Sequence, residues 1–278
     1  MHTIKSRLPA LAAACAFALA SGGALAQDRP ADAGSFEGPA VAPGKESPEA
    51  RKLLIEMAKF LSGTQKFSFK ATAAYDTVQA TGQKIEFVEI RRFDVQRPNQ
   101  LRAEVEQSDG DVGVAYFDGK HISAFSESKK VYAQADAPGA LDDTVAFFMK
   151  EMKMKLPLAA LLINKSPEAL DKRVKSIDYV EDSDILGTPA AHLAGRTETV
   201  DFEIWIDNGA KPIPRRIVLT YRNVEGAPQY RAQLTDWNFA PKFKADTFAF
   251  TPPKDAQKIS FLTQVKQGPN VKSPGGSP

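Results

Sequence analysis

The sequence predicts an α+β protein: a single curved antiparallel sheet, forming a half-open β-barrel, with helices covering the concave face. About ten segments alternate apolar and polar residues with a period of two. Apolar residues recur at helical spacing in only two regions, at the start and in the middle of the folded part. Because strands and helices do not alternate regularly, we do not expect the parallel sheet of an α/β protein.

Residues 1–26 are predicted to be a signal peptide. The apolar run from Leu8 to Ala20 follows Lys5 and Arg7, and it precedes Ala24-Leu25-Ala26, a small-x-small cleavage pattern. As a helix, this run spans about 20 Å, which is shorter than a hydrocarbon core of about 30 Å. We therefore expect a cleaved signal, a periplasmic location and no transmembrane segment in the mature chain.

Two further stretches contain little that a core could bury. Residues 27–46 and residues 264–278 are dominated by small, polar and turn-forming residues, so we expect a disordered linker and a disordered tail. Residues 47–263 remain as one folded domain.

Charge and cysteine content exclude several classes of protein. Loss of Lys5 and Arg7 with the signal lowers the basic residues from 36 to 34, equal to the 34 acidic residues. Without a net positive field, nucleic-acid binding is not expected. The one cysteine, Cys15, lies in the signal, so the mature chain has no disulfide. Ala12-Ala13-Ala14 before it lacks the large aliphatic residue of a lipoprotein signal, which favours a soluble protein.

The folded region opens with an amphipathic helix. Ser47 can cap it, Pro48 suits its first turn, and Gly63 can end it. Between them, an apolar stripe recurs at helical spacing: Leu53, Leu54, Met57, Phe60 and Leu61.

Strands follow this helix. Phe67, Phe69, Ala71, Ala73 and Tyr75 share one face of the first strand, and the intervening residues are mostly polar. Asp109-Gly110 and Asp118-Gly119 predict tight turns between antiparallel neighbours. Between Phe87 and Val88 the apolar residues change face, which predicts a bulge.

The middle of the chain is helical, and the remainder returns to strands. Leu141, Val145, Phe148 and Met152 repeat at helical spacing, and two shorter helices are predicted over Pro157–Ile163 and Pro167–Val174. The later strands are predicted near Ile177–Ile185, Ala190–Arg196, Val200–Ile206, Ile217–Tyr221 and Tyr230–Trp237.

No residue pattern supports catalysis, so we predict a protein that is not an enzyme and has no catalytic residues, no metal site and no cofactor. His121 and His192 are the mature histidines and have no cysteine partner for zinc. Glu104 and Glu106 lie about 7 Å apart on one strand face, a separation that suits paired carboxylates, but on the polar side of the alternation. Solvent exposure explains them better.

Several short motifs resemble a known superfamily when they are taken in order. They are Phe67-Ser68-Phe69, Arg97-Pro98-Asn99, Phe117-Asp118-Gly119-Lys120, Trp205-Ile206-Asp207 and Phe248-Ala249-Phe250-Thr251-Pro252-Pro253. The sequence resembles the lipoprotein-carrier (LolA-like) superfamily, and more closely a bacterial family of predicted periplasmic proteins of unknown function. The resemblance implies a half-open barrel whose apolar cavity is capped by helices. It also implies that Arg97 contacts the helical lid; the alternative is an exposed arginine at a strand end.

These observations predict a binder of an acyl chain, a lipid or another apolar ligand. The candidate wall and lid residues are Phe69, Tyr75, Phe87, Tyr116, Phe148, Met152 and Trp205. A Met, Phe and Leu stripe like that around Met152 is more often ordinary core than ligand surface. The alternative function is an envelope protein-protein interaction or sensor module with a filled core.

Overall fold

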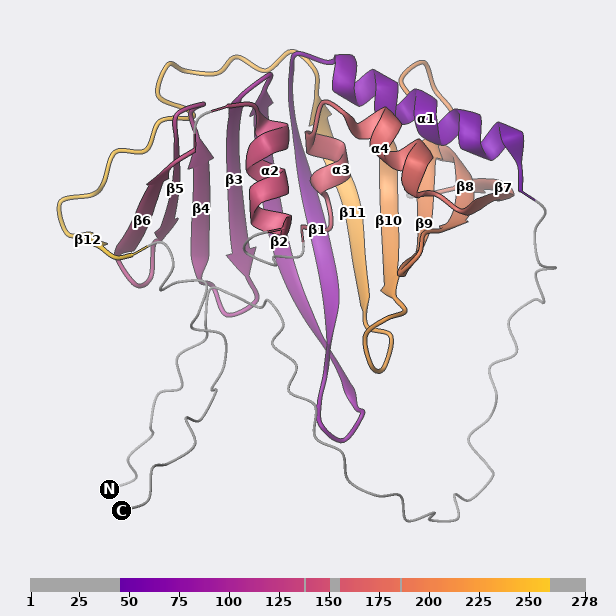
Figure 1. Cartoon of the computed structure of the whole chain (residues 1–278), viewed down its shortest axis with the longest axis horizontal. Helices are drawn as coiled ribbons and strands as arrows, with labels where there is room; N and C mark the ends of the chain where they lie inside the picture. The colour runs from indigo at the N-terminus through magenta and orange to yellow at the C-terminus, as the bar shows by residue number, and fades with distance from the viewer. Residues whose placement is uncertain (1–45, 138, 151–155, 186, 261–278) are drawn as a thin grey trace.

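The computed structural model describes residues 46–137, 139–150, 156–185 and 187–260 (Figure 1). The predicted signal peptide, nearly all of the predicted linker and the predicted tail lie outside these residues.

The chain folds as predicted, into one open and mostly antiparallel sheet of 12 strands with helices on its concave face. The strand order is β12-β6-β5-β4-β3-β2-β1-β11-β10-β9-β8-β7, and the two ends do not pair to close a barrel. The helices are α1 (Pro48–Gly63), α2 (Leu141–Lys150), α3 (Ala159–Leu162) and α4 (Ser166–Arg173). The strands are β1 (Lys66–Val78), β2 (Lys84–Gln96), β3 (Gln100–Gln107), β4 (Val112–Phe117), β5 (His121–Ser126), β6 (Val131–Asp136), β7 (Ser176–Asp184), β8 (Pro189–Arg196), β9 (Val200–Asp207), β10 (Pro214–Tyr221), β11 (Gln229–Asn238) and β12 (Gln257–Lys258).

The first helix begins where its sequence predicts. The Ala50 amide donates to the Ser47 hydroxyl over 3.1 Å, and Pro48 occupies the first turn. The Ser47 amide also donates to the Ile177 carbonyl over 2.8 Å, which attaches the start of α1 to the edge strand β7. Local capping and a distant strand therefore fix the same helix end.

We call the sheet face that carries the helices the inner face, and the opposite one the outer face. In Figure 1, α2 lies over β2 and β3, α3 lies over β1 and β11, and α1 and α4 lie over the β7 to β10 side. The main core forms between the helices and the inner face, where Leu54, Leu61, Phe67, Val95 and Phe117 are all fully buried. Burial of apolar surface between the helices and the inner face stabilises the domain.

The β1–β2 hairpin corrects one prediction. Its pairing runs without a break from Lys66–Gln96 to Val78–Lys84, so no bulge separates Phe87 from Val88. The hairpin projects past the neighbouring strands and past the helices (Figure 1). Phe87 points inward and Val88 outward, and both are exposed, at 41% and 44%. The mixed apolar pattern reflects a two-stranded projection with both faces open, not a change of register.

Part of the outer face is covered by the segment that follows β11. This segment ends in β12, which pairs parallel with β6 through Gln257 and Lys258. The Phe250 ring packs against Tyr116, Phe125 and Tyr132, with ring centroids 5.3 to 5.8 Å apart. The motif around Phe250 thus covers the outer side of β4 to β6.

Candidate ligand-binding face

Arg97 links two helices to the end of β2. Its Nη1 donates to the Leu162 carbonyl and to Asn164 Oδ1, each over 2.6 Å, and its Nη2 donates to the Leu61 carbonyl over 3.2 Å. Leu162 ends α3 and Leu61 lies in the last turn of α1, where carbonyls carry partial negative charge. The Leu61 carbonyl also accepts from the Thr64 amide over 3.2 Å. The cation therefore joins the C-terminal ends of both helices to the sheet.

The Arg97 side chain is buried but keeps its positive charge. The side chain is 7% exposed, and burial lowers the pKa of the guanidinium to about 10, against the effect of the nearby Asp142 carboxylate. Asp142 accepts hydrogen bonds from both nitrogens of Asn164 and from the Lys165 amide. An ordered polar network thus fixes the connection between α3 and α4.

Among the described residues, the helical cover ends well before the inner face does. Leu141 starts α2 beside Arg97, since its amide donates to the Pro98 carbonyl over 3.0 Å. The ten residues of α2 extend about 15 Å, at about 1.5 Å each. In the same direction, β2 runs about 33 Å from Arg97 to Phe87, at about 3.3 Å per residue. The far part of the inner face lies beyond the reach of α2.

A continuous row of side chains crosses five strands in that far part. Phe87 pairs with Tyr75, Tyr75 with Tyr230, Tyr230 with Leu219, and Leu219 with Phe202. We call these five residues the inner row. Four of them keep partial exposure to solvent, and the Tyr75 and Phe87 rings stack with centroids 5.8 Å apart. The row therefore offers a band of apolar and aromatic surface beside the closed core.

An ion pair lies between the inner row and the core. Arg91 Nε donates to Glu89 Oε1 over 2.5 Å, and both side chains point to the inner face because they pair with Ala71 and Ala73. Glu89 is buried, and Arg91 is partly buried. The small alanines leave space for these long side chains. The inner face thus combines an apolar row with one internally neutralised charge pair.

The structure brings only some of the predicted site residues together. Tyr75 and Phe87 belong to the inner row, whereas Phe69 is closed into the core between Phe93 and Trp237, with centroid separations of 4.7 and 4.4 Å. Phe148 is also buried, on α2. Met152 lies outside the described residues.

Tyr116 and Trp205 require correction, because both lie on the outer face. Tyr116 pairs with Arg102, and its neighbour Phe117 is the residue that enters the core. The strand is apolar on both faces because the Phe250 segment covers the outer one. Trp205 stacks on His192 at 3.9 Å, while Ile204 and Ile206 point inward.

A bulge brings Trp237 to the inner face. The β1–β11 register shifts between Ser68 and Lys70, and Asp236 adopts a left-handed backbone with φ of 55° at this point. The extra residue restores an inward direction for Trp237, whose ring stacks on Phe69. Strict alternation from Leu234 places Trp237 outward, so only the bulge reveals its position.

The carboxylates and the histidine that the sequence offered for catalysis form hydrogen bonds or ion pairs within the fold. Burial raises the pKa of Glu104, but hydrogen bonds from Arg102 and Arg92 outweigh it and lower the pKa below its ordinary value. Glu106 shares Arg92, over 3.2 Å. His192 lies 3.0 Å from Glu203 on β9. In the described ranges, no three His, Cys, Asp or Glu residues are arranged to hold a metal ion.

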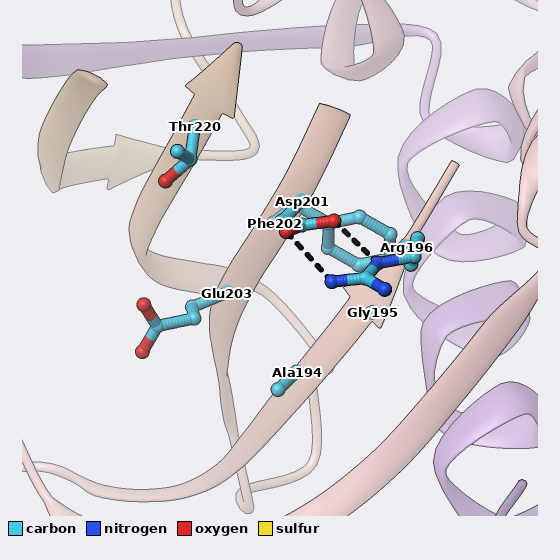
Figure 2. A pocket seen from close by; sticks show the side chains of 7 residues that line it. All are labelled: Ala194, Gly195, Arg196, Asp201, Phe202, Glu203 and Thr220. Carbon is cyan, nitrogen blue, oxygen red and sulfur yellow. Dashed lines mark hydrogen bonds and ion pairs between the residues drawn. The ribbon is translucent and has the colours of Figure 1, made fainter. Parts of the chain in front are cut away.

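Two pockets lie at the margins of the sheet, and the first shares Phe202 with the inner row. One of about 290 Å³ lies over β8, β9 and β10, and Figure 2 shows Arg196 paired with Asp201 across it, beside the Phe202 ring. Asp201 also accepts from Arg222 over 2.8 Å, so its charge is satisfied within the protein. The second, of about 540 Å³, separates β3 to β5 from the Phe250 segment, and its lining is mixed polar and apolar.

A family model decides the identification. It is described as "Predicted periplasmic protein (DUF2092)", and it matches residues 50–262, which is most of the chain. The chain belongs to this family. The DUF2092 match confirms the family resemblance and covers nearly all of the predicted domain. No curated protein sequence matches significantly. In the part of the chain that the structure describes, no helix has the length and apolar character needed to cross a bilayer.

Several solved structures resemble this DUF2092 protein at low identity. An uncharacterized conserved protein from Thermus thermophilus is 12% identical, with a TM-score of 0.45, over 76% of this chain and 99% of its own. LprF from Mycobacterium bovis is 14% identical, with a TM-score of 0.45, over 77% and 100%. LolA superfamily protein NE2245 from Nitrosomonas europaea is 8% identical, with a TM-score of 0.35, over 72% and 97%.

Proposed function

We propose that this DUF2092 protein is exported through a signal peptide cleaved after Ala26 and binds an apolar ligand in the periplasm, without catalysing a reaction. The ligand's apolar part lies along the inner row. The single observation that supports this is the register itself, because five consecutive strands contribute an apolar side chain at the same level.

The composition of the row suits an acyl chain or a comparable apolar group. Aromatic rings present large apolar areas with few rotatable bonds, so ordering them on a ligand has a low entropic cost. Each methylene moved from water to such a surface contributes about 0.8 kcal/mol. A chain of several methylenes can therefore bind without a charged anchor.

Phe87 offers the sharpest test, since it is exposed at 41% and the main ring contact that its replacement removes is the stack with Tyr75. A phenylalanine side chain has about 200 Å² of surface, so about 80 Å² of it is open to a ligand. At about 25 cal/mol per Å², covering that area contributes about 2 kcal/mol, or roughly thirty-fold in affinity. Phe87→Ser is expected to weaken binding by up to this factor.

Val88→Ser is the matched control. Val88 is the next residue on the same strand, is equally exposed, and points to the outer face. Wild type and both variants are purified from the periplasm without detergent, examined by native mass spectrometry for a copurifying lipid, and titrated with a dansyl-labelled acylglycerol. A copurifying lipid with selective loss in Phe87→Ser supports the proposal. Ligand-free protein that does not bind the probe contradicts it and favours the filled interaction module.

A further inference from the structure

The inner row contains a polar group with no partner. Tyr230 is 4% exposed, and its hydroxyl forms no hydrogen bond with the described residues. Burial raises the pKa of this phenol, so the hydroxyl stays protonated and can donate. Buried hydroxyls in folded proteins are nearly always paired, so an unpaired one within the inner row calls for an explanation.

The neighbouring ion pair supplies further donors. The bond to Glu89 uses only Nε of Arg91, and neither terminal nitrogen of this guanidinium has a hydrogen-bond partner among the residues described. Arg91 pairs with Ala71 and Tyr230 pairs with Tyr75, so both side chains project from the inner face on either side of β1, four residues apart along that strand. Arg91 and Tyr230 thus supply unused donors beside an apolar band.

The charge of this cluster restricts the group that it can accept. Glu89 already neutralises Arg91 at 2.5 Å, so the pair has no net charge. A ligand carboxylate placed here would add a negative charge beside Glu89 with no cation left to balance it. A neutral oxygen acceptor, such as the carbonyl of an ester or amide, can use the same donors without that cost.

We propose that Tyr230 and Arg91 form a polar subsite that hydrogen-bonds the ester or amide carbonyl of an acyl chain lying on the inner row. This inference rests on the proposed function and adds the ligand class: esterified or amide-linked acyl chains in preference to free fatty acids. The subsite lies at the third position of the row, between Tyr75 and Leu219.

Tyr230→Phe tests the subsite because it removes only the unpaired hydroxyl. A structural role predicts lower stability, whereas the subsite predicts unchanged or higher thermal stability with weaker binding. Tyr132→Phe is the control, since Tyr132 packs on the outer face against Phe250. The probes are 1-monolauroylglycerol and laurate, which share one acyl chain and are used below their aggregation concentrations in a displacement assay with the mature chain at pH 7.5.

The expected results separate this inference from the proposed function. Wild type should bind monolauroylglycerol at least ten-fold more tightly than laurate, and Tyr230→Phe should lose about three- to ten-fold for the ester, as a single neutral hydrogen bond implies. Equal ester affinity in Tyr230→Phe and wild type, or a wild-type preference for laurate, overturns the subsite while leaving the proposed function intact. If neither probe binds wild type, the proposed function itself fails.

Discussion

Replacement of Arg97 by Met should weaken the attachment of the helices to the sheet. The methionine retains much of the apolar stem but removes three hydrogen bonds, to Leu162, Asn164 and Leu61. Charge-assisted bonds of this kind contribute about 2 kcal/mol each, or about 6 kcal/mol together. Burial lowers the pKa of Arg97 to about 10, well below the ordinary value of a guanidinium. The lowered pKa corresponds to about 3 kcal/mol against the charged form, the balance of burial and the opposing Asp142 charge, and this cost opposes the bonds. We expect a net loss of about 3 kcal/mol in the free energy of unfolding.

The assay is urea denaturation followed by tryptophan fluorescence. Trp237 stacks on Phe69 in the core, so its emission reports the packing that the helices cover. With a slope of about 2 kcal/mol per molar urea, the midpoint should fall by about 1.5 M. Arg92→Met is the control from the same strand: Arg92 is half-exposed on the outer face and pairs with Glu104 and Glu106, so its loss should cost about 1 kcal/mol or less.

Hydrogen exchange locates the effect. Amides of α3 and α4 should lose protection in Arg97→Met and keep it in Arg92→Met, because only Arg97 bonds the end of α3. If Arg97→Met loses less than about 1 kcal/mol and α3 and α4 keep their wild-type protection, the reasoning about the buried cation is refuted, and Arg97 is an ordinary strand-end residue.

Two further substitutions test the turn chemistry and an internal carboxylate. Gly119→Ala should lower stability by about 2 kcal/mol, because φ is 90° and an added Cβ would lie 2.3 Å from Asn99 Nδ2. Gly110→Ala, with a similar φ but open space, should lose about half as much in the same thermal denaturation. Asp76→Asn should remove stability at neutral pH: burial raises the pKa of Asp76, but hydrogen bonds from Arg231 outweigh it and lower the pKa below 3.8. The wild-type carboxylate therefore stabilises the fold above pH of about 4, and this contribution is lost on acidification. The difference in unfolding free energy between wild type and Asp76→Asn should shrink as the pH falls below about 4 and through the folded pKa of Asp76. A difference that does not change with pH would contradict the assignment.

The fold could be predicted where local chemistry and tertiary contacts agree. Ser47 caps α1 as its sequence indicates, and the alternation from Phe67 to Tyr75 identifies the inner face correctly because helices cover one side of that strand. The glycines of the two predicted turns, Gly110 and Gly119, have the positive φ that such turns require. In each case residues close together in the sequence determine the local structure, so a short stretch of sequence is sufficient to predict it.

Other residues could not be placed because a distant segment determines their surroundings. Tyr116 lies opposite the core, yet the strand is apolar on both faces because Phe250, more than a hundred residues later, covers it. Trp205 is outward for a similar reason, since His192 of the adjacent strand covers its ring. Trp237 depends on a bulge at Asp236 that no apolar pattern reveals.

The inner row shows why exposure of single residues is weak evidence for a binding site. An isolated exposed phenylalanine such as Phe87 is common on protein surfaces and needs no explanation. Its significance comes from register, because the pairing of β2, β1, β11, β10 and β9 aligns it with Tyr75, Tyr230, Leu219 and Phe202. These residues come from strands that are far apart in the sequence, so local periodicity cannot group them. Arg97 holds the helices at the opposite end of β2 from Phe87, and the described part of α2 does not extend as far as the row. The contacts of Arg97 that hold the helices over the core therefore also set the boundary of the surface that remains for a ligand.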